Sequence, residues 1–255
     1  MKLLISGLCG HMGTEVAKLA LAGCRGAEPD GIVGVDVGAC GAEGVPCAQS
    51  FEDAAARADV FAAVDCIVDF SHHSATPALL AFATAHGIPV VLATTGHTEE
   101  ELAAIHKAAA SIPVFFAANF SLGVALLIDT ARRVAAAMPE AEIEIIEKHH
   151  DRKLDAPSGT ALAIARALCE VRPDATVVTG RSGMGKRQKE EIGIHAIRMG
   201  NIVGEHEVII GTPNQTITLK HEAHDRALFA EGALAAAAFL CAGRPAGLYG
   251  MTDLV

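Results

Sequence analysis

The feature that most constrains the fold is a glycine-rich turn close to the N-terminus. The short apolar run 2–6 leads directly into Gly7-Leu8-Cys9-Gly10-His11-Met12-Gly13 and then into a helical stretch that extends to about Cys24. Glycines at this spacing permit a tight turn, let the backbone approach a pyrophosphate, and allow the helix to pack closely against the strand. The N–H groups at the helix start can hold phosphate oxygens. The pattern predicts a strand–turn–helix unit that binds a dinucleotide.

An acidic residue ends the second strand candidate, Gly31–Asp36. In a dinucleotide-binding fold, a carboxylate at this position accepts hydrogen bonds from the adenosine ribose hydroxyls. A plain turn followed by a strand-end acid is the weaker interpretation, because the strand, turn and helix occur in the expected order. Val37, and not Lys or Arg, follows Asp36, so a 2′-phosphate would meet a carboxylate without an adjacent cation. The sequence therefore predicts a preference for NADH over NADPH.

Three further apolar strands follow before residue 118, at Cys66–Phe70, Ile88–Ala93 and Ile112–Ala117. Helical stretches separate them, one running from Ser74 to Gly87 and one starting with a capping box at Thr98. Continuously apolar strands between helices indicate a parallel sheet that is covered on both faces.

Ligands of such sheets bind outside the carboxyl ends of the strands. We therefore expect two strand-end segments, Ala93-Thr94-Thr95 and Ala117-Ala118-Asn119-Phe120, to complete the cofactor site. Taken alone, each segment is better explained as an ordinary turn between a strand and a helix.

The pattern changes after Asn119. A helix at 122–137 precedes segments that alternate polar and apolar residues, which lie at 142–145, 192–199, 205–210 and 216–220. Alternation is typical of a sheet with one exposed or partner-facing side. The chain is therefore predicted to be an α/β protein with a doubly wound parallel sheet and a second, α+β domain that contains a mixed or antiparallel sheet. The segment 180–192 is expected to be a mobile loop, and 225–241 a final helix.

The densest polar segment runs from Glu147 to Thr160 and reads EKHHDRKLDAPSGT. Pro157 suits an early helix position, so the amides of Gly159 and Thr160 are expected at a helix start, where they form an anion site. His149, His150 and Lys153 lie just upstream and suit acid–base chemistry. The segment predicts a carboxylate pocket with proton donors beside it, whereas in isolation residues 149–153 would be interpreted as a solvated basic loop.

Composition excludes several other classes. The formal net charge of −10 argues against a nonspecific nucleic-acid binder. No apolar run approaches the roughly 20 residues that span a bilayer, and the N-terminal run is too short for a signal peptide. The seven cysteines are scattered and form no Cys-x-x-Cys pair, so we expect reduced thiols, no metal site and a cytoplasmic location.

The chain resembles the 4-hydroxy-tetrahydrodipicolinate (dihydrodipicolinate) reductase family over essentially its whole length. The most specific match is the segment Glu147-x-His149-His150-x-x-Lys153-x-Asp155-Ala156-Pro157-Ser158-Gly159-Thr160-Ala161. Further matches are the glycine turn, Thr94-Thr95-Gly96, Asn119-Phe120-Ser121-x-Gly123, Arg198-x-Gly200-x-Ile202-Val203-Gly204-Glu205-His206 and Gly247-Leu248-Tyr249.

The resemblance implies a Rossmann-type dinucleotide-binding domain formed by residues 1–118 and 222–255. It also implies a substrate-binding and oligomerisation domain at 119–221 and a homotetramer. The implied reaction is NADH- or NADPH-dependent reduction of a dihydrodipicolinate ring, which forms from 4-hydroxy-tetrahydrodipicolinate, to tetrahydrodipicolinate in lysine and diaminopimelate biosynthesis. Its substrate is a small cyclic dicarboxylate.

The resemblance also implies residue roles. His149 would be the proton donor and acceptor, Lys153 the proton donor, and His150, Gly159 and Thr160 the substrate-binding residues. The cofactor would be bound by Gly7, Leu8, Cys9, Gly10, His11, Met12, Asp36, Ala93, Thr94, Thr95, Ala117, Ala118, Asn119 and Phe120. The family usually has Gly where this chain has Ala93, and Ala costs about 1–2 kcal/mol there if the position requires a positive φ. Domain closure, with hinges near Asn119 and His221, is expected to bring the nicotinamide to the ring.

Three alternatives remain open at this stage. A different oxidoreductase, such as an amino-acid or semialdehyde dehydrogenase, would share the first domain but not the polar segment at 147–160. A redox-sensing dinucleotide binder would leave His149, His150 and Lys153 without a role, and would bind cofactor without turnover. A purely structural paralogue is disfavoured by the intact motifs.

Overall fold

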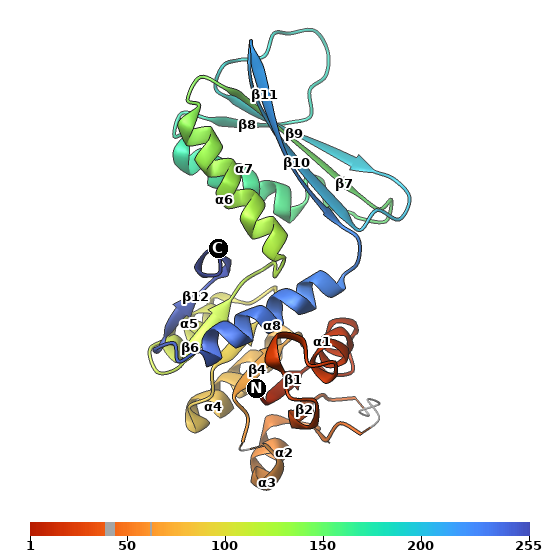
Figure 1. The fold of residues 1–255 in the computed structure, drawn as a ribbon, viewed down its shortest axis with the longest axis vertical. Helices are drawn as coiled ribbons and strands as arrows, with labels where there is room; N and C mark the ends of the chain where they lie inside the picture. Colours follow the sequence, from red (N-terminus) through yellow and green to blue (C-terminus); the bar gives the residue numbers. More distant parts are fainter. Residues whose placement is uncertain (39–43, 62) are drawn as a thin grey trace. The chain divides into compact units, whose positions relative to one another are not determined.

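The computed structural model describes residues 1–38, 44–61 and 63–255, and the chain forms two compact units (Figure 1). The N-terminal unit consists of Met1–Ser121 together with Ala227–Leu254. The central unit consists of Leu122–Arg226 and the terminal residue Val255.

A parallel sheet forms the middle layer of the N-terminal unit. Within the described residues its strand order is β12-β6-β5-β4-β1-β2-β3, and all neighbouring strands run parallel. The strands are β1 (Leu3–Ser6), β2 (Ile32–Val35), β3 (Cys47–Ala48), β4 (Cys66–Asp69), β5 (Val90–Leu92), β6 (Pro113–Phe116) and β12 (Gly247–Tyr249).

Helices cover both faces of this sheet. The core on one face contains Leu3 and Ile5 together with side chains of α1 (His11–Leu21) and α8 (Ala227–Cys241). Leu4 points to the other face, where α2 (Phe51–Ala56), α4 (Thr76–His86) and α5 (Glu99–Ala109) pack. Because successive strand residues point to opposite faces, a strand buried on both faces is apolar throughout. The doubly wound α/β prediction is confirmed.

Local signals set the ends of two of these helices. The hydroxyl of Thr98 accepts a hydrogen bond from the Glu101 N–H at 3.2 Å, and the Glu101 carboxylate accepts one from the Thr98 N–H at 2.8 Å, which completes the predicted capping box. Helix α4 ends at Gly87, whose φ of 67° is the left-handed conformation that glycine adopts without strain.

The central unit is an α+β fold with a mixed sheet. Its strand order is β11-β10-β7-β9-β8, with β10 antiparallel to β7 and β11, and β9 parallel to β7 and β8. The strands are β7 (Glu142–His149), β8 (Thr176–Thr179), β9 (Glu191–Arg198), β10 (Gly204–Thr212) and β11 (Gln215–Ala223). Helices α6 (Leu122–Ala137) and α7 (Gly159–Val171) pack on one face and bury Ile143 and Ile145 (Figure 1).

Several short elements carry too weak a pattern to be predicted from the sequence. They are β3, α2, α3 (Ala58–Phe61), β8 and β12, together with the 3₁₀ turns Cys24–Gly26, Pro29–Gly31, His73–Ala75 and Met251–Asp253. Each of these except α2 has four residues or fewer, which spans little more than one period of a helix or two of a strand and is too short to show a repeating pattern. Residues 180–190 form neither helix nor strand.

Two expectations about the whole chain can be compared with the structure. No helix among the described residues is long and apolar enough to cross a membrane. Cys9, Cys24, Cys66, Cys169 and Cys241 form no disulfide, but Cys47 is disulfide-bonded, so the expectation that all thiols are reduced is wrong at this residue. Cys40 lies outside the described residues.

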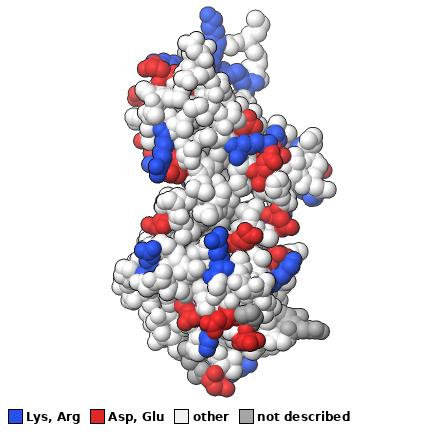
Figure 2. Space-filling view, viewed as in Figure 1, with Lys and Arg blue, Asp and Glu red and all other residues white. Residues whose placement is uncertain are grey.

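On the face in Figure 2, Lys and Arg side chains are interspersed with Asp and Glu.

Candidate active site

The glycine turn has the geometry that its sequence predicts. Gly7 has a φ of 80°, and the N-cap residue Gly10 leads into α1 at His11. A Cβ atom added to Gly13 would lie 2.0 Å from the carbonyl oxygen of Gly7, so only glycine lets the helix pack this closely on the turn. The turn therefore presents backbone amides at the start of α1, as a pyrophosphate site requires.

The carboxylate of Asp36 is fixed beside this turn. It accepts a hydrogen bond from the N–H of Cys9 at 2.8 Å and one from the N–H of Gly38 at 2.8 Å. These bonds join the end of β2 to the glycine turn, and they leave carboxylate lone pairs for ribose hydroxyls because each oxygen can accept more than one hydrogen bond.

A cavity of about 630 Å³ opens at the carboxyl ends of β1, β2 and β4. Its described lining includes Gly7, Cys9, Gly10 and Asp36, which the sequence predicted, and Val37. The lining residues that sequence reasoning missed follow β3 and β4: Gln49, Ser50, Phe51, Glu52, Phe70, Ser71, His72, Ser74 and Ala75. The strand-end rule, applied to Phe70 as it was to the other strands, identifies the residues after β4. It could not identify those after β3, because that strand was not predicted.

A buried carboxylate organises the next loop along the sheet edge. Asp69, at the end of β4, is fully buried and accepts hydrogen bonds from the hydroxyls of Thr94 at 2.7 Å and Ser71 at 2.6 Å. Thr94 is buried with it, whereas Thr95 is exposed. Ala93 is not among the described residues with positive φ, so its replacement of glycine introduces no backbone strain.

Two of the predicted cofactor residues place their side chains in the core. Leu8 and Phe120 are 1% and 2% exposed and pack on the α1 and α8 side of the sheet. Only their backbone atoms are available to a cofactor. The carboxamide oxygen of Asn119 accepts a hydrogen bond from the Ser121 N–H at 2.8 Å and so closes the turn after β6. His11 and Ala118 are exposed, and Met12 and Ala117 are partly buried.

In the central unit, the buried face of β7 changes from apolar to polar along the strand. Ile143 and Ile145 pack against the helices, and two residues further on the same face carries Glu147 and then His149, both buried. The strand register places Arg198 of β9 beside His149 and His206 of β10 opposite Glu147.

Glu147 is the centre of a hydrogen-bonded cluster. The guanidinium of Arg198 donates to both carboxylate oxygens at 2.8 Å, Nδ1 of His149 lies 2.6 Å from Oε2, and the N–H of Ser158 donates to Oε1 at 3.0 Å. Burial raises the pKa of Glu147, but the hydrogen bonds from Arg198 and His149 outweigh this effect and hold the pKa below its ordinary value. The group is therefore an ionised carboxylate at neutral pH.

Helix α7 begins beside this cluster. The hydroxyl of Ser158 caps the helix by accepting a hydrogen bond from the Ala161 N–H at 3.2 Å, and Gly159 and Thr160 form the first turn. Pro157 precedes the cap, so the expectation that it occupies an early helix position is wrong, although the predicted helix start at Gly159 and Thr160 is found. First-turn N–H groups point out of a helix, along a dipole that favours anions.

His206 fills the space between the cluster and the cap. It is 4% exposed, and its Nε2 lies 3.2 Å from the Ser158 hydroxyl. Burial and the neighbouring His149 lower the pKa of His206 to about 4, so this ring is neutral at physiological pH.

The remaining sequence-predicted residues, His150 and Lys153, lie in the segment between β7 and α7. The ammonium group of Lys153 pairs with Asp155 at 2.9 Å, and the N–H of Lys153 donates to the carbonyl of His150. Nδ1 of His150 is buried without a hydrogen-bond partner, and partial desolvation together with Arg152 lowers the pKa of this imidazole. All the predicted substrate and catalytic residues thus lie within one polar region of the central unit.

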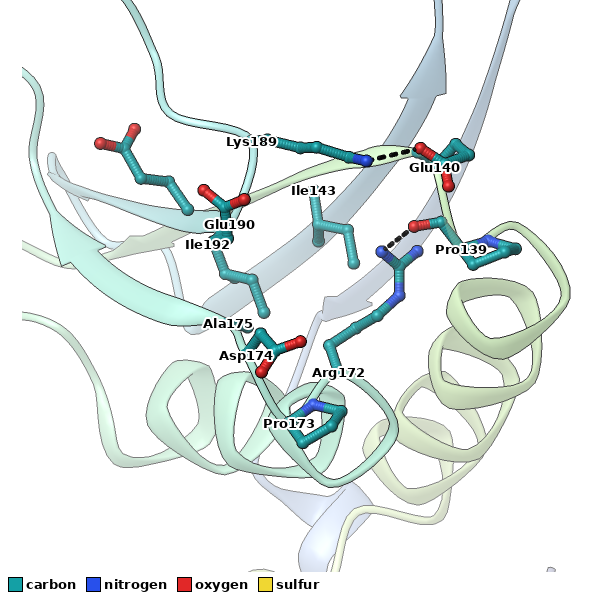
Figure 3. Close-up of a pocket in the computed structure, with 12 residues that line it drawn as sticks. Pro139, Glu140, Ile143, Arg172, Pro173, Asp174, Ala175, Lys189, Glu190 and Ile192 are labelled. Carbon is teal, nitrogen blue, oxygen red and sulfur yellow. Dashed lines mark hydrogen bonds and ion pairs between the residues drawn. The ribbon is translucent and has the colours of Figure 1, made fainter.

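A second cavity, of about 290 Å³, lies at the other end of this unit and is lined by residues near Pro139, Arg172 and Lys189 (Figure 3). The Arg172 guanidinium donates to the carbonyl oxygens of Ala135, Met138 and Pro139, which end α6. Lys189 pairs with Glu140 at 2.7 Å (Figure 3). The described lining contains more carboxylates (Glu140, Asp174, Glu190 and Glu191) than cations, so this cavity is less suited to an anionic substrate than the α7 start is.

A doubly wound parallel sheet with a glycine turn and an acidic residue after β2, together with a separate α+β unit, is the architecture of dinucleotide-dependent oxidoreductases. No group of His, Cys, Asp and Glu in the described part of the chain is arranged to hold a metal ion.

The chain belongs to the dihydrodipicolinate reductase family. The family models for the N-terminus and the C-terminus of dihydrodipicolinate reductase match residues 1–120 and 123–255. The chain is 44% identical to a 4-hydroxy-tetrahydrodipicolinate reductase of Caldanaerobacter subterraneus subsp. tengcongensis, with 100% of this chain and 98% of the relative covered. It is 42% identical to that of Alkaliphilus metalliredigens, with 100% and 99% covered.

Solved structures share the fold. Dipicolinate-bound dihydrodipicolinate reductase from Paenisporosarcina sp. TG-14 superimposes with a TM-score of 0.78 at 24% identity and covers 100% of this chain and 99% of its own. A diaminopimelate dehydrogenase of C. glutamicum gives a TM-score of 0.58 at 15% identity, with 99% and 93% covered. The chain is therefore an oxidoreductase that carries out the NAD(P)H-dependent reduction step of lysine and diaminopimelate biosynthesis.

The glycine turn can be tested by replacing Gly13 with Ala. The added methyl group would overlap the Gly7 carbonyl, so the turn must open and NADH affinity should fall at least tenfold, a loss of about 1.4 kcal/mol. Fluorescence titration with NADH measures this. Gly87→Ala is the control, because it introduces strain at a positive φ but meets no atom within 4 Å. Unchanged NADH affinity in Gly13→Ala would contradict the assignment.

Proposed function

We propose that this chain reduces the 2,3-dihydrodipicolinate ring, formed from 4-hydroxy-tetrahydrodipicolinate by loss of water, to tetrahydrodipicolinate. The observation that carries the proposal is the link that Glu147 makes between His149 and the α7 start, because its carboxylate binds Nδ1 of His149 and accepts the N–H of Ser158, the cap residue of α7. His150 and Lys153 follow His149 within four residues of the chain. A solved relative with the same fold is described as dipicolinate-bound, and dipicolinate is the aromatic analogue of this ring.

One ring carboxylate would be held at the start of α7. The N–H groups of Gly159 and Thr160 donate along the helix axis, and His150 adds a polar contact. A Cβ added to Gly159 would meet no atom of the described residues within 4 Å, so the space beside this residue is open. Bonds from fixed backbone amides bind the carboxylate in one orientation and so orient the ring.

The proton chemistry would be carried by His149 and Lys153. Bound nicotinamide cofactor supplies the hydride. Hydride addition at one end of the conjugated imine shifts electrons toward the ring nitrogen and produces an enamine, which is then protonated on carbon. His149 would deliver this proton, while Lys153 stabilises the developing negative charge and pairs with a carboxylate.

Kinetics of two variants separate these roles. His149→Gln removes the proton donor and should lower kcat by roughly 10²-fold or more with little change in KM, since general acid catalysis contributes about 10²–10⁴-fold. Thr160→Ala should mainly raise KM. The control His106→Gln changes an exposed histidine of α5 in the N-terminal unit, and it should retain activity. Unchanged kcat in both His149→Gln and Lys153→Ala would rule out the assignment.

We also propose that NADH is preferred over NADPH. None of the described residues that line the cofactor cavity is Lys or Arg, whereas Asp36 and Glu52 contribute carboxylates. A 2′-phosphate adjacent to Asp36 would therefore experience repulsion without a compensating cation.

Substitution of Val37 tests the cofactor preference. Val37 is 94% exposed at the cavity edge, so Val37→Arg adds a cation without disturbing the core. The ratio of kcat/KM for NADPH to that for NADH should rise at least tenfold, and Val37→Gln provides a control of similar polarity without charge. A wild-type enzyme that strongly prefers NADPH would refute the proposal.

The enzyme is further proposed to be a homotetramer that assembles through the outer face of the five-stranded sheet. This face carries Ile146, Ile197 and Ile209 between ion pairs such as Lys148–Glu205 at 3.0 Å. Ile197 is 40% exposed, while α6 and α7 pack on the opposite face. A partly apolar sheet face of this kind suits a subunit contact.

Light scattering after size exclusion measures the assembly. Ile197→Glu places a charge in the middle of the proposed contact and should shift the wild-type tetramer toward smaller species. Leu126→Glu is the control, because Leu126 is 48% exposed on α6, away from the sheet face. A wild-type monomer at micromolar concentration would contradict the proposal.

A further inference from the structure

The structure assigns Glu147 as the positioning residue that fixes the ring of His149, with the proton on Nδ1 and Nε2 left for the substrate. This inference rests on the proposed function, in which His149 handles the proton. It concerns a side chain that lies behind the imidazole and is not expected to contact substrate.

The hydrogen bond between Glu147 and His149 can run in only one direction. An ionised carboxylate can only accept hydrogen bonds. Glu147 is completely buried, and Arg198 supplies it with two charge-assisted bonds, so the carboxylate remains ionised. Nδ1 of His149 lies 2.6 Å from Oε2 and must therefore carry a proton. In the neutral ring this leaves Nε2 as the basic atom, and in the charged ring Nε2–H is the transferable proton.

Gly204 determines the space around Nε2 of His149. A Cβ atom added to Gly204 would lie 3.1 Å from Nε2 and 3.4 Å from Cδ2 of His149. Any side chain at residue 204 would therefore crowd the edge of the ring that carries Nε2. Gly204 and Glu147 act on opposite nitrogens of the same imidazole, since one leaves room at Nε2 and the other binds Nδ1.

The carboxylate of Glu147 also binds the start of α7. Its other oxygen accepts the N–H of Ser158, the cap residue of the helix whose first turn is the proposed carboxylate site. One buried group therefore sets both the proton donor and the anion site. The separation between the two is fixed by hydrogen bonds on a single side chain.

His206 preserves this arrangement. Its ring centroid lies 5.2 Å from that of His149 in an edge-on orientation. It is neutral, so no second positive charge competes with an imidazolium at His149. Its contact with the Ser158 hydroxyl packs the ring against the helix cap.

The decisive experiment is NMR spectroscopy of the full-length enzyme labelled with ¹⁵N-histidine, without substrate. The His149 signals are assigned by their loss in His149→Gln, and spectra are recorded at a pH where the ring is neutral. Nδ1 should be protonated and Nε2 should be the bare nitrogen. A ring with the proton on Nε2, or an equal mixture of tautomers, would overturn the inference.

Kinetics of Glu147→Gln provide a second readout. Gln retains the shape but can turn either its oxygen or its NH₂ group toward Nδ1, so the fraction of correctly oriented rings falls. We expect kcat to fall by roughly 10²–10³-fold with KM changed much less, since loss of an orienting carboxylate behind a catalytic histidine can cost about 10⁴-fold. Equal activity in Glu147→Gln and wild type would overturn the inference.

Two further variants protect this test against misfolding. Glu147→Gln leaves the guanidinium of Arg198 without its ionic partner, and an unpaired charge destabilises the fold. The double variant Glu147→Gln/Arg198→Gln removes both charges and should be more stable than Glu147→Gln. It should show the same loss of kcat. Gly204→Ala should lower kcat while the Nδ1–H tautomer persists in the NMR spectrum. NADH affinity reports on the separate N-terminal unit and should be unchanged in all of these variants.

The outcomes distinguish the inference from the proposed function. The Nδ1–H tautomer in an enzyme that does not reduce the dihydrodipicolinate ring would overturn the proposed function and leave the geometry of His149 supported. Turnover of the ring by an enzyme whose His149 carries its proton on Nε2 would support the function and overturn the positioning role of Glu147.

Discussion

The ionised carboxylate of Glu147, completely removed from water, is the constraint on which the arrangement of the central unit depends. A buried charge is tolerated only when it is paired and fully hydrogen-bonded. Arg198, His149 and the Ser158 amide satisfy this requirement, and each is thereby held at a defined position. Strand β9 supplies the cation, β7 the imidazole, and the cap of α7 the amide. The proposed site lies beside Glu147 because the groups that neutralise and hydrogen-bond this carboxylate come from β9, β7 and the α7 cap.

Each unit is proposed to bind an anion although the chain as a whole is acidic, and the two units use different groups to do so. The chain carries a net charge of −10, yet its cofactor and its substrate are both anions. The N-terminal unit offers the backbone amides of a glycine turn, whose shape depends on the missing side chain of Gly13. The central unit combines a helix start with a few cationic side chains. In both proposed sites the attraction for an anion would come from local N–H groups and not from the overall charge.

Much of the fold can be predicted from the sequence because burial gives each kind of strand its own pattern. Strands buried on both faces are apolar throughout, whereas strands buried on one face alternate polar and apolar residues. Continuous apolar runs identify β1 and β4, and alternation identifies β10. The glycine turn, Asp36 and the polar segment 147–160 are identifiable because special backbone geometry and ionisable groups are concentrated in short stretches. Strand β3 is missed because two residues carry no periodicity.

The parts of the site that the sequence could not predict depend on tertiary contacts. Strand register brings Arg198 and His206 next to Glu147, and no local pattern encodes that register. The family resemblance marks these residues but gives no role to them. Leu8 and Phe120 show the opposite case, because they lie in the predicted cofactor segments but turn their side chains into the core.

The most direct test of the account is a crystal structure of the enzyme with NADH and pyridine-2,6-dicarboxylate bound. The account predicts that one ligand carboxylate accepts hydrogen bonds from the amides of Gly159 and Thr160, with Nε2 of His149 facing the ring and the cofactor along the glycine turn. A dicarboxylate bound away from residues 149–160, or a His149 ring turned into bulk water in that complex, would contradict it.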